Sequence, residues 1–449
     1  MNERFDGRLL GRDDPDYERA RRGAVWNART PERFPELIVQ AASERDAVAA
    51  VRLAIAHELT VTVRSGGHSW AGNHLRDGSL LLDLSQLRGV ELDAPAMRAS
   101  VQPGVRGDDL LSALGERDLF FPAGHCPGVG LGGYLLQGGY GWNGRLHGPA
   151  CMSVEAIDLI TAAGELVRAD ETHNSDLLWA ARGSGPGFFG VVTRFHLRLA
   201  PRPRVTANAL QTYPIELLED VFSWAQEIAP RVPRTMEMML FLHRDEHGEP
   251  EIAVTGPALV DDAEQAHAAL DLLQSCPALP HAKLNVPYVE LTLPDLYAGA
   301  HLSYPDEHRY AVDNMWTSAP ASELLPGLRE IAEGLPEAPS HMLWMNWGPG
   351  CTPAPQRPEM AYSVEDDTHI ALYAVWQDPA RDAANLAWAT DSMRAMEHLA
   401  SGIQLADENL GSRPARFLGD AQMRRLDEVR AARDPDGRFH EWMGRHDRA

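Results

Sequence analysis

Apolar residues in the first half of the chain recur with the spacings of short strands and of one early helix. Residues 37–39, 61–64 and 79–84 are brief apolar or alternating runs, and each predicts a strand. Between the first two runs, apolar residues return at helical spacing behind Ser43, whose hydroxyl suits a helix N-cap. The order strand, helix, strand predicts a βαβ-like opening. Residues before about position 30 are rich in Arg and Asp, and we expect them to be irregular.

The pattern continues up to residue 200, with glycine-rich stretches between the elements. Residues 107–117 predict a helix, and two runs around Gly164, at 154–161 and 165–169, predict a hairpin. Residues 176–181 are a short apolar turn, and the strict alternation of 188–199 predicts a strand. Residues 200–204 contain two prolines, which interrupt any regular element and mark the clearest boundary in the chain.

After that boundary, strand patterns alternate with helical ones. Strands are predicted at 236–242, 251–259, 341–347 and 369–376, and helices at 216–228, 262–274, 321–333, 383–401 and 420–432. In the run 369–376, Ile370, Leu372, Ala374 and Trp376 share one face, and Tyr373 lies on the other. The arrangement predicts an antiparallel sheet with helices packed on one face.

Composition narrows the class of protein. The 449 residues carry a net charge of −23, which argues against nucleic acid or an anionic membrane as partner. We find no apolar run of about 18 residues and no secretory signal. Four cysteines, at 126, 151, 276 and 351, lack CxxC spacing, so zinc and a disulfide framework are not expected. We expect a soluble, cytoplasmic protein that acts on a small molecule.

Three glycine-rich segments, at 65–67, 128–141 and 183–190, are the candidate ligand site. Glycine lets backbone amides approach a ring or a pyrophosphate closely, so one elongated cofactor could lie along all three. His68 and Cys126 stand inside the first two segments, and imidazole and thiolate are soft nucleophiles near neutral pH. An ordinary surface turn and an inert buried cysteine are the alternative interpretations of these two residues.

Residues 128–133 also match the G-x-G-x-x-G dinucleotide fingerprint, with Glu155 near the position of a ribose-binding acid. That fingerprint must follow a buried strand and open a helix. Here residues 121–127 do not form a strand pattern, and we expect the stretch up to Gly141 to be too glycine-rich to start a stable helix. We therefore reject a Rossmann domain.

The motifs resemble those of the vanillyl-alcohol oxidase (PCMH-type FAD-binding) superfamily, and within it the berberine-bridge-enzyme-like FAD-linked oxidases. Residues 64–69 match its R-S-G-G-H-S loop, and residues 124–133 match its G-x-C-x-x-V-G-x-G-G element. Residues 138–141, 178–192 and the D-P-x-x-x-F ending at 434–439 follow in the same order. The resemblance is dense over 33–200, weak in the middle and loose over the last forty residues.

The resemblance implies an α+β fold and a division of the chain into four parts. These are a lead-in at 1–32, a PCMH-type FAD-binding domain of two small α/β subdomains at 33–202, a substrate domain with an antiparallel sheet backed by helices at 203–400, and a returning segment at 401–449. It also implies FAD bonded through its 8α-methyl to His68 and through C6 to Cys126. The implied contacts of the cofactor are Arg64, Ser65, Gly66, Gly67, Ser69, Val129, Gly130, Gly132, Gly133, Gly138, Gly141, Val191 and Val192, with 65–69 on the pyrophosphate and the two valines beside the adenine.

The expected reaction is hydride abstraction from a C–H next to O or N of a bulky natural product or carbohydrate, with electrons passing to oxygen. A dehydrogenase with another acceptor and a flavin-binding protein without turnover are the alternatives. The family's N-Y-x-D segment is not found; residues 403–409 stand near its place and contain no tyrosine. The catalytic base is therefore unassigned, with Tyr362, Tyr373, Glu365, Tyr140 and His147 as candidates.

Overall fold

A small mixed sheet begins the fold and ends at the candidate ligand loop. The computed structural model describes residues 5–348 and 357–445, so Cys351 lies outside the described residues. The strands are ordered β1 (Arg8–Gly11), β2 (Leu37–Gln40), β4 (Leu80–Asp83) and β3 (Val61–Arg64), and the last three are parallel. The helix α2 (Glu44–Ala56) connects β2 to β3 and begins at Ser43, whose side chain accepts a hydrogen bond from the Asp46 amide. The predicted βαβ-like opening is confirmed.

The expectation of an irregular N-terminus is wrong. β1 pairs antiparallel with β2, and α1 (Tyr17–Gly23) follows it. Only Tyr17 and Arg21 of α1 are buried, so this helix has little apolar periodicity to detect. β1 likewise gains its backbone partners from β2, which lies about thirty residues later in the sequence.

A second, antiparallel sheet lies beside the first. Its strands are ordered β5 (Val90–Asp93), β6 (Arg98–Val101), β10 (Val191–Arg198), β8 (Val154–Ile160) and β9 (Leu166–Ala169). The hairpin predicted around Gly164 is β8 and β9. β10 begins three residues later than predicted, because residues 185–187 form a 3₁₀ turn before it. The segment predicted as a turn is the helix α6 (Ser175–Ala181).

The glycine-rich segment 128–141 belongs to a stretch of short elements that connects β6 to β8. This stretch includes α3 (Gly107–Gly115), β7 (Leu119–Phe120), α4 (Leu131–Leu136) and α5 (Gly144–His147). Our expectation that no helix could begin here is wrong, since α4 forms with Leu131, Tyr134 and Leu135 buried. β7 pairs antiparallel with β11 (Ala200–Pro201), so the strand before the fingerprint has no parallel partner and the segment is not a βαβ unit.

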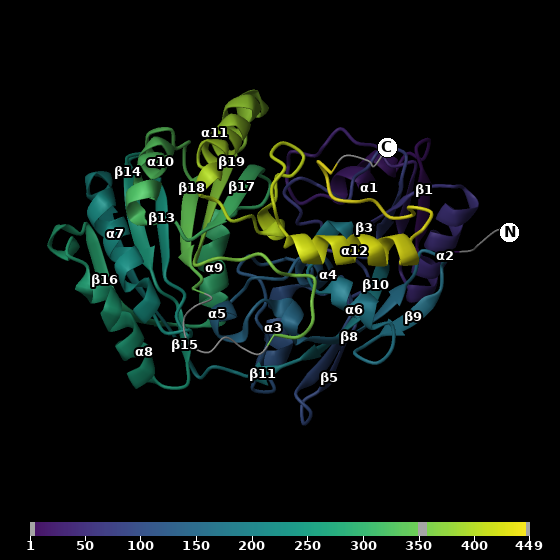
Figure 1. The fold of residues 1–449 in the computed structure, drawn as a ribbon, viewed down its shortest axis with the longest axis horizontal. Coiled ribbons are helices and arrows are strands. Elements are labelled where there is room, and N and C mark those ends of the chain that lie inside the picture. The colour runs from purple at the N-terminus through teal and green to yellow at the C-terminus, as the bar shows by residue number, and fades with distance from the viewer. Residues whose placement is uncertain (1–4, 349–356, 446–449) are drawn as a thin grey trace.

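The two sheets described so far belong to the first lobe. The second lobe is built on one antiparallel sheet of eight strands. The strands run in the order β15 (Ala258–Val260), β12 (Val205–Pro214), β14 (Pro250–Thr255), β13 (Met239–Arg244), β18 (His341–Asn346), β19 (Thr368–Trp376) and β17 (Arg309–Thr317), with β16 (Leu284–Leu291) paired to β12. Four helices cover the face away from the first lobe: α7 (Leu218–Ile228), α8 (Ala263–Leu270), α10 (Ala321–Glu333) and α11 (Asp382–Ala395). Figure 1 shows this layering, and it confirms the predicted antiparallel sheet with helices on one face.

Alternation along the strands of this sheet separates its two faces. Leu240, Trp344 and Leu372 pack under the helices, whereas Phe241 and Tyr373 face the first lobe. The face assignment made for residues 369–376 is thereby confirmed. Strands β12, β16 and β17 were missed, because β12 is rich in alanine and polar residues, β16 contains a proline, and β17 carries adjacent Asp and Asn side chains.

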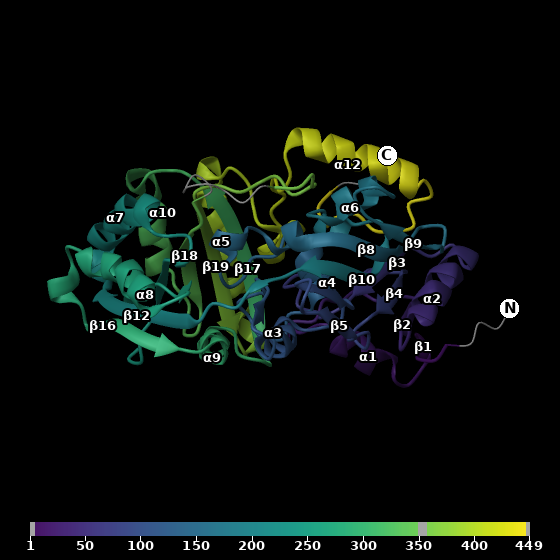
Figure 2. The same cartoon turned by 90° about the horizontal axis from the view of Figure 1, so that it is seen from below.

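The C-terminal segment crosses back from the second lobe to the first. Helix α12 (Asp420–Arg433) lies over α6 and the first lobe in Figures 1 and 2. The Val61 amide then donates a hydrogen bond of 2.7 Å to the Arg438 carbonyl, beside a parallel bridge between Val61 and Phe439. The chain end is thus held against the strand that leads into the candidate loop.

Candidate functional site

One large cavity lies between the two lobes. Its volume is about 610 Å³, within the usual range for small-molecule sites. The loop after β3, the glycine-rich segment, the inner face of the large sheet and the helix α9 (Leu293–Ser303) line it. Gln404, Ala406, Asp407, Phe439 and His440 also line it.

The loop after β3 is fixed by an ion pair and by direct backbone packing. Arg64 bonds Asp83 on β4 at 2.8 Å, and Gly67 has φ of +77°, a left-handed conformation that favours glycine. A Cβ placed on Gly130 would lie 2.6 Å from the Gly66 amide nitrogen, so the two glycine segments touch through their backbones. The loop can therefore present backbone groups to a ligand without moving.

Most of the sequence-predicted cofactor residues come together at this cavity. Those that line it are Arg64, Ser65, Gly66, Gly67, His68, Ser69, Cys126, Val129, Gly130, Gly132, Gly133 and Val192. Gly138, Gly141 and Val191 do not line it. Gly138 packs against the Tyr362 ring, a Cβ on Gly141 would clash with the Ala123 carbonyl, and Val191 is a buried strand residue. These three act in packing.

His68 projects into the cavity as a neutral imidazole. Its ring stacks on Trp26 with centroids 4.4 Å apart and an interplanar angle of 16°. Burial lowers the pKa of His68 to about 4, so the ring keeps a free electron pair at neutral pH. Trp26 is held in turn by Asp306, which accepts a 2.7 Å hydrogen bond from the indole nitrogen. Trp26 lies in the segment expected to be an irregular lead-in, and no sequence signal marked it.

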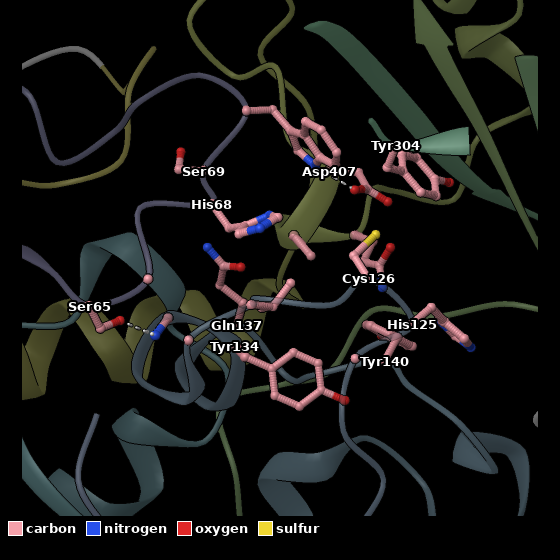
Figure 3. A pocket seen from close by; sticks show the side chains of 18 of the residues that line it. Ser65, His68, Ser69, His125, Cys126, Tyr134, Gln137, Tyr140, Tyr304 and Asp407 are labelled. Atoms are coloured by element: carbon pink, nitrogen blue, oxygen red, sulfur yellow. Dashed lines mark hydrogen bonds between the residues drawn. The ribbon is translucent and has the colours of Figure 1, made fainter. Parts of the chain in front are cut away.

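Cys126 also projects into the cavity, but as a thiol. Burial, and after it the negative charge of Asp407, raises the pKa of Cys126 to about 12. The sequence predicts a soft nucleophile near neutral pH at this position, whereas the Cys126 thiol must first lose its proton before it can act as one. Figure 3 shows the sulfur directed toward the part of the pocket where Asp407 and Tyr304 lie.

The five candidates for the catalytic base separate into two groups. Tyr373 and Tyr140 line the cavity, whereas Tyr362, Glu365 and His147 do not. The Tyr362 hydroxyl donates to Glu365 at 2.8 Å, so these two bond each other outside the cavity. Burial lowers the pKa of His147 to about 4, with its ring packed toward Phe120.

Tyr373 bonds a buried carboxylate that the sequence analysis did not single out. Its hydroxyl donates to Asp407 Oδ2 at 2.8 Å, and Trp70 Nε1 donates to Oδ1 at 2.9 Å. Burial raises the pKa of Asp407 above its ordinary value and, with the Asp407 charge adding to it, raises that of Tyr373 as well. Asp407 belongs to the 403–409 segment, where only a missing tyrosine was noted; its carboxylate was the available signal.

Residues of β17 hold that segment in place. The Asn314 side-chain nitrogen donates to the backbone carbonyls of Gln404 and Asp407, and its side-chain oxygen accepts from the Gln404 backbone N–H at 2.7 Å. Arg413 forms a buried ion pair with Asp313 and donates to the Asn314 carbonyl at 2.7 Å. Through these bonds β17 fixes the position of the Asp407 backbone.

Tyr304, at the end of α9, is a second phenol at the same wall. His341 Nδ1 lies 2.9 Å from the Pro339 carbonyl, which can only accept, so Nδ1 carries the proton. His341 Nε2 must then accept from the Tyr304 hydroxyl, 3.2 Å away. The Tyr304 and Tyr373 rings meet edge to face with centroids 5.1 Å apart. Both hydroxyl hydrogens are therefore committed to protein partners, which leaves the oxygens as acceptors.

Polar atoms without a protein partner indicate that the cavity holds a polar ligand. Asn73 Oδ1, His74 Nε2 and the Tyr140 hydroxyl line the cavity, are buried, and have no hydrogen-bond partner. Unpaired buried polar atoms are costly unless a ligand or water satisfies them. Together with the glycine walls, they fit the elongated FAD that the motifs imply. Within 5–348 and 357–445 there is no cluster of metal-binding side chains and no helix able to span a membrane.

Comparison with known proteins supports this interpretation. The FAD binding domain family matches residues 35–170. The FAD-linked oxidoreductase nodO of Hypoxylon pulicicidum is 32% identical over 440 residues, which cover 96% of each chain.

Two solved structures share the fold at low sequence identity. Physcomitrella patens BBE-like 1 has a TM-score of 0.85 at 20% identity and covers 97% of this chain and 96% of its own. The 6-hydroxy-D-nicotine oxidase of Arthrobacter nicotinovorans has a TM-score of 0.83 at 21% identity and covers 97% of both chains. The chain therefore belongs to the family of FAD-linked oxidoreductases with this FAD binding domain, and it shares the fold of the berberine-bridge-enzyme-like structure.

Proposed function

We propose that this FAD-linked oxidoreductase is an oxidase whose flavin is bonded to both His68 and Cys126. It would take hydride from a C–H next to O or N of a bulky natural product or carbohydrate and pass the electrons to oxygen. The observation that carries the proposal is the cavity itself, in which both anchors and the Tyr373–Asp407 pair line one space. The flavin, when bound, supplies the hydride acceptor; the chain supplies position and a base.

His68 and Cys126 have different tasks in this arrangement. The neutral imidazole can attack without losing a proton first, and its stack on Trp26 fixes the ring plane. The Cys126 thiol needs a proton acceptor before it can bond. Two attachment points would hold the cofactor without a closed pocket around its substrate side, which suits a large substrate.

Tyr373 would take the proton that leaves the oxidised group of the substrate. The pKa of this phenol is raised well above 10, so it does not ionise alone at neutral pH. Its hydrogen bond to Asp407 solves this, because the phenol can pass its own proton to the carboxylate as it accepts one from the substrate. Tyr304 would accept a second hydrogen bond and orient the substrate. Both acceptors suit an alcohol or amine.

The walls of the cavity indicate the kind of molecule that enters. The inner face of the large sheet contributes Met239, Phe241, Leu343 and Met345, a broad apolar surface. Helix α9 adds Gly299, Ala300 and Ser303, whose small side chains leave room beside the acceptors. A large, mainly apolar substrate with one reacting hydroxyl or amine fits this combination.

The attachment is tested by mass spectrometry of the denatured protein. Wild-type protein should stay yellow after acid precipitation, His68→Ala and Cys126→Ala should each keep one bond, and the double variant should release all flavin. Release of all colour from the wild type would refute covalent attachment.

The base is tested by anaerobic reduction of the flavin with a panel of alcohols, sugars and amines. With any substrate found, Tyr373→Phe should slow reduction about 10²- to 10⁴-fold, the usual contribution of a positioned base. Tyr362→Phe removes a buried hydroxyl outside the cavity and should leave the rate unchanged. An equal loss in the two variants would refute the role of Tyr373.

Stopped-flow mixing of reduced protein with oxygen tests the electron acceptor: slow reoxidation would indicate a dehydrogenase.

A further inference from the structure

Formation of the second flavin bond needs a group that removes the Cys126 proton. Cys126 lines the cavity with its side chain partly buried, and it is a thiol at neutral pH, because burial raises its pKa to about 12. Thiolate, not thiol, is the reactive species in sulfur substitution. The pocket must therefore contain a proton acceptor, and the lining residues that can serve are few.

We propose that Asp407 accepts the Cys126 thiol proton when the sulfur bonds to flavin, an assignment that rests on the two-point attachment proposed above. Among the described residues lining the cavity, the carboxylates are Asp295 and Asp407. Asp295 is exposed at the start of α9, where its Oδ2 accepts from the Thr292 amide and hydroxyl at 2.8 and 2.6 Å, and the carboxylate whose charge acts on Cys126 is Asp407. Asp407 is left.

Asp407 is both held and free to accept. Trp70 and Tyr373 each donate one hydrogen bond, one to each carboxylate oxygen. A carboxylate oxygen has two lone pairs, so one remains on each oxygen. The negative charge of Asp407 adds to the rise in the pKa of the Cys126 thiol. Figure 3 shows the two side chains facing the same part of the pocket.

The other titratable groups that face Cys126 are poorer acceptors. The ring of His125 is bonded through Nε2 to Glu237 at 2.8 Å and is directed away from the sulfur in Figure 3. His68 is itself the other proposed attachment point, and its ring is stacked on Trp26. Tyr304 and Tyr373 keep their hydroxyl protons, since burial raises the pKa of both well above 10.

The step balances with dioxygen as oxidant. The S–H bond of Cys126 breaks and its proton passes to Asp407, while the sulfur electron pair forms the S–C6 bond. The hydrogen on C6 would leave as a proton, and the two electrons released would pass through the ring system to dioxygen. The proton held by Asp407 and the proton from C6 would both end in hydrogen peroxide, so thiol, C6–H and dioxygen would give a thioether and hydrogen peroxide.

The test compares attachment in purified holoprotein by mass spectrometry of flavin-bearing peptides. Asp407→Asn keeps the side-chain shape and an acceptor but not the base, so we expect the histidyl bond alone, with cysteinyl occupancy reduced at least tenfold. Asp407→Glu should restore part of the cysteinyl bond. Tyr373→Phe keeps the carboxylate and should carry both bonds, although its reduction by substrate is slow.

Each outcome distinguishes the two proposals. A wild-type protein without a cysteinyl bond would refute the two-point attachment itself. A wild type with both bonds and Asp407→Asn with undiminished cysteinyl bond would overturn only the role of Asp407. Loss of both bonds in a folded Asp407 variant, judged by circular dichroism, would also overturn it, because the carboxylate would then act on flavin binding as a whole. Asp407→Ser, which is smaller, asks the same question if the asparagine variant does not accumulate.

Discussion

Removal of Arg413 should destabilise the protein by far more than removal of an exposed arginine. Arg413 and Asp313 are 5% and 1% exposed, and the guanidinium also donates to the Asn314 carbonyl. Breaking a buried pair from one side costs about 3–5 kcal/mol, because the other charge is left buried and unpaired. Asp313 would keep its hydrogen bonds from the Asn409 side chain, at 2.9 Å, and from the Asn314 backbone N–H, at 2.8 Å. We therefore expect Arg413→Met to cost about 3 kcal/mol, the lower end of that range.

The free energy of unfolding from urea titration measures this cost, and a second variant tests its cause. Adding Asp313→Asn removes the stranded charge, so the double variant should recover about 2 of the 3 kcal/mol. Arg329→Met breaks an exposed pair with Glu219, 53% and 64% exposed, and should cost less than about 1 kcal/mol. A double variant as unstable as Arg413→Met, or an equal cost for Arg329→Met, would refute the reasoning.

Two further predictions concern the glycine contact and acid stability. Gly66→Ala should abolish flavin incorporation, because the new Cβ would lie 2.9 Å from the Gly130 Cα. The ratio of flavin to protein absorbance measures incorporation. The control Gly115→Ala has open space around the new Cβ and should incorporate flavin normally. Burial lowers the pKa of His341 to about 4 and of His369 to about 3, so the unfolded chain binds more protons below its pKa of about 6.5 and stability should fall as pH drops from 6.5 toward 4. The urea midpoints of unfolding at pH 7.5 and 5 measure this loss of stability, and the loss should be smaller in His369→Gln. An equal loss in the variant and the wild type would contradict the prediction.

Local signals predicted the parts of the fold that local chemistry determines. The helix after Ser43 has a capping residue and a periodic apolar face, and the loop that ends in His68 carries its glycines within the sequence itself. β1 and β17 were missed because their strand character depends on partners elsewhere: β1 on β2, and the Asp313–Asn314 pair of β17 on Arg413 and the 404–407 segment. Polar side chains in a buried strand contradict the pattern on which prediction relies.

The same distinction applies to the candidate site. The proposed attachment residues, His68 and Cys126, lie in loops whose glycines mark them, and a family motif accompanies each. Trp26, Tyr304 and Asp407 come from three distant segments and meet only in the folded chain, at His68 and Tyr373. Tyr373 and Tyr362 are equally buried and each donates to a carboxylate, but Tyr373 lines the cavity and Tyr362 does not. Long-range contacts, which one sequence does not reveal, decide between them.

Asp407 is the carboxylate that lines the cavity beside Cys126 and Tyr373. Burial makes His68 a neutral ring and Cys126 a thiol, and it keeps Tyr304 and Tyr373 protonated, so most of the reacting wall neither gains nor loses charge near pH 7. A carboxylate among these groups gives the site a proton acceptor for sulfur or for substrate. Asp407 supplies this carboxylate although it is buried, and Asn314 of β17 holds it in place by donating to its backbone carbonyl. Attachment of the cofactor and oxidation of the substrate would then depend on one acceptor, used first for Cys126 and afterwards through Tyr373.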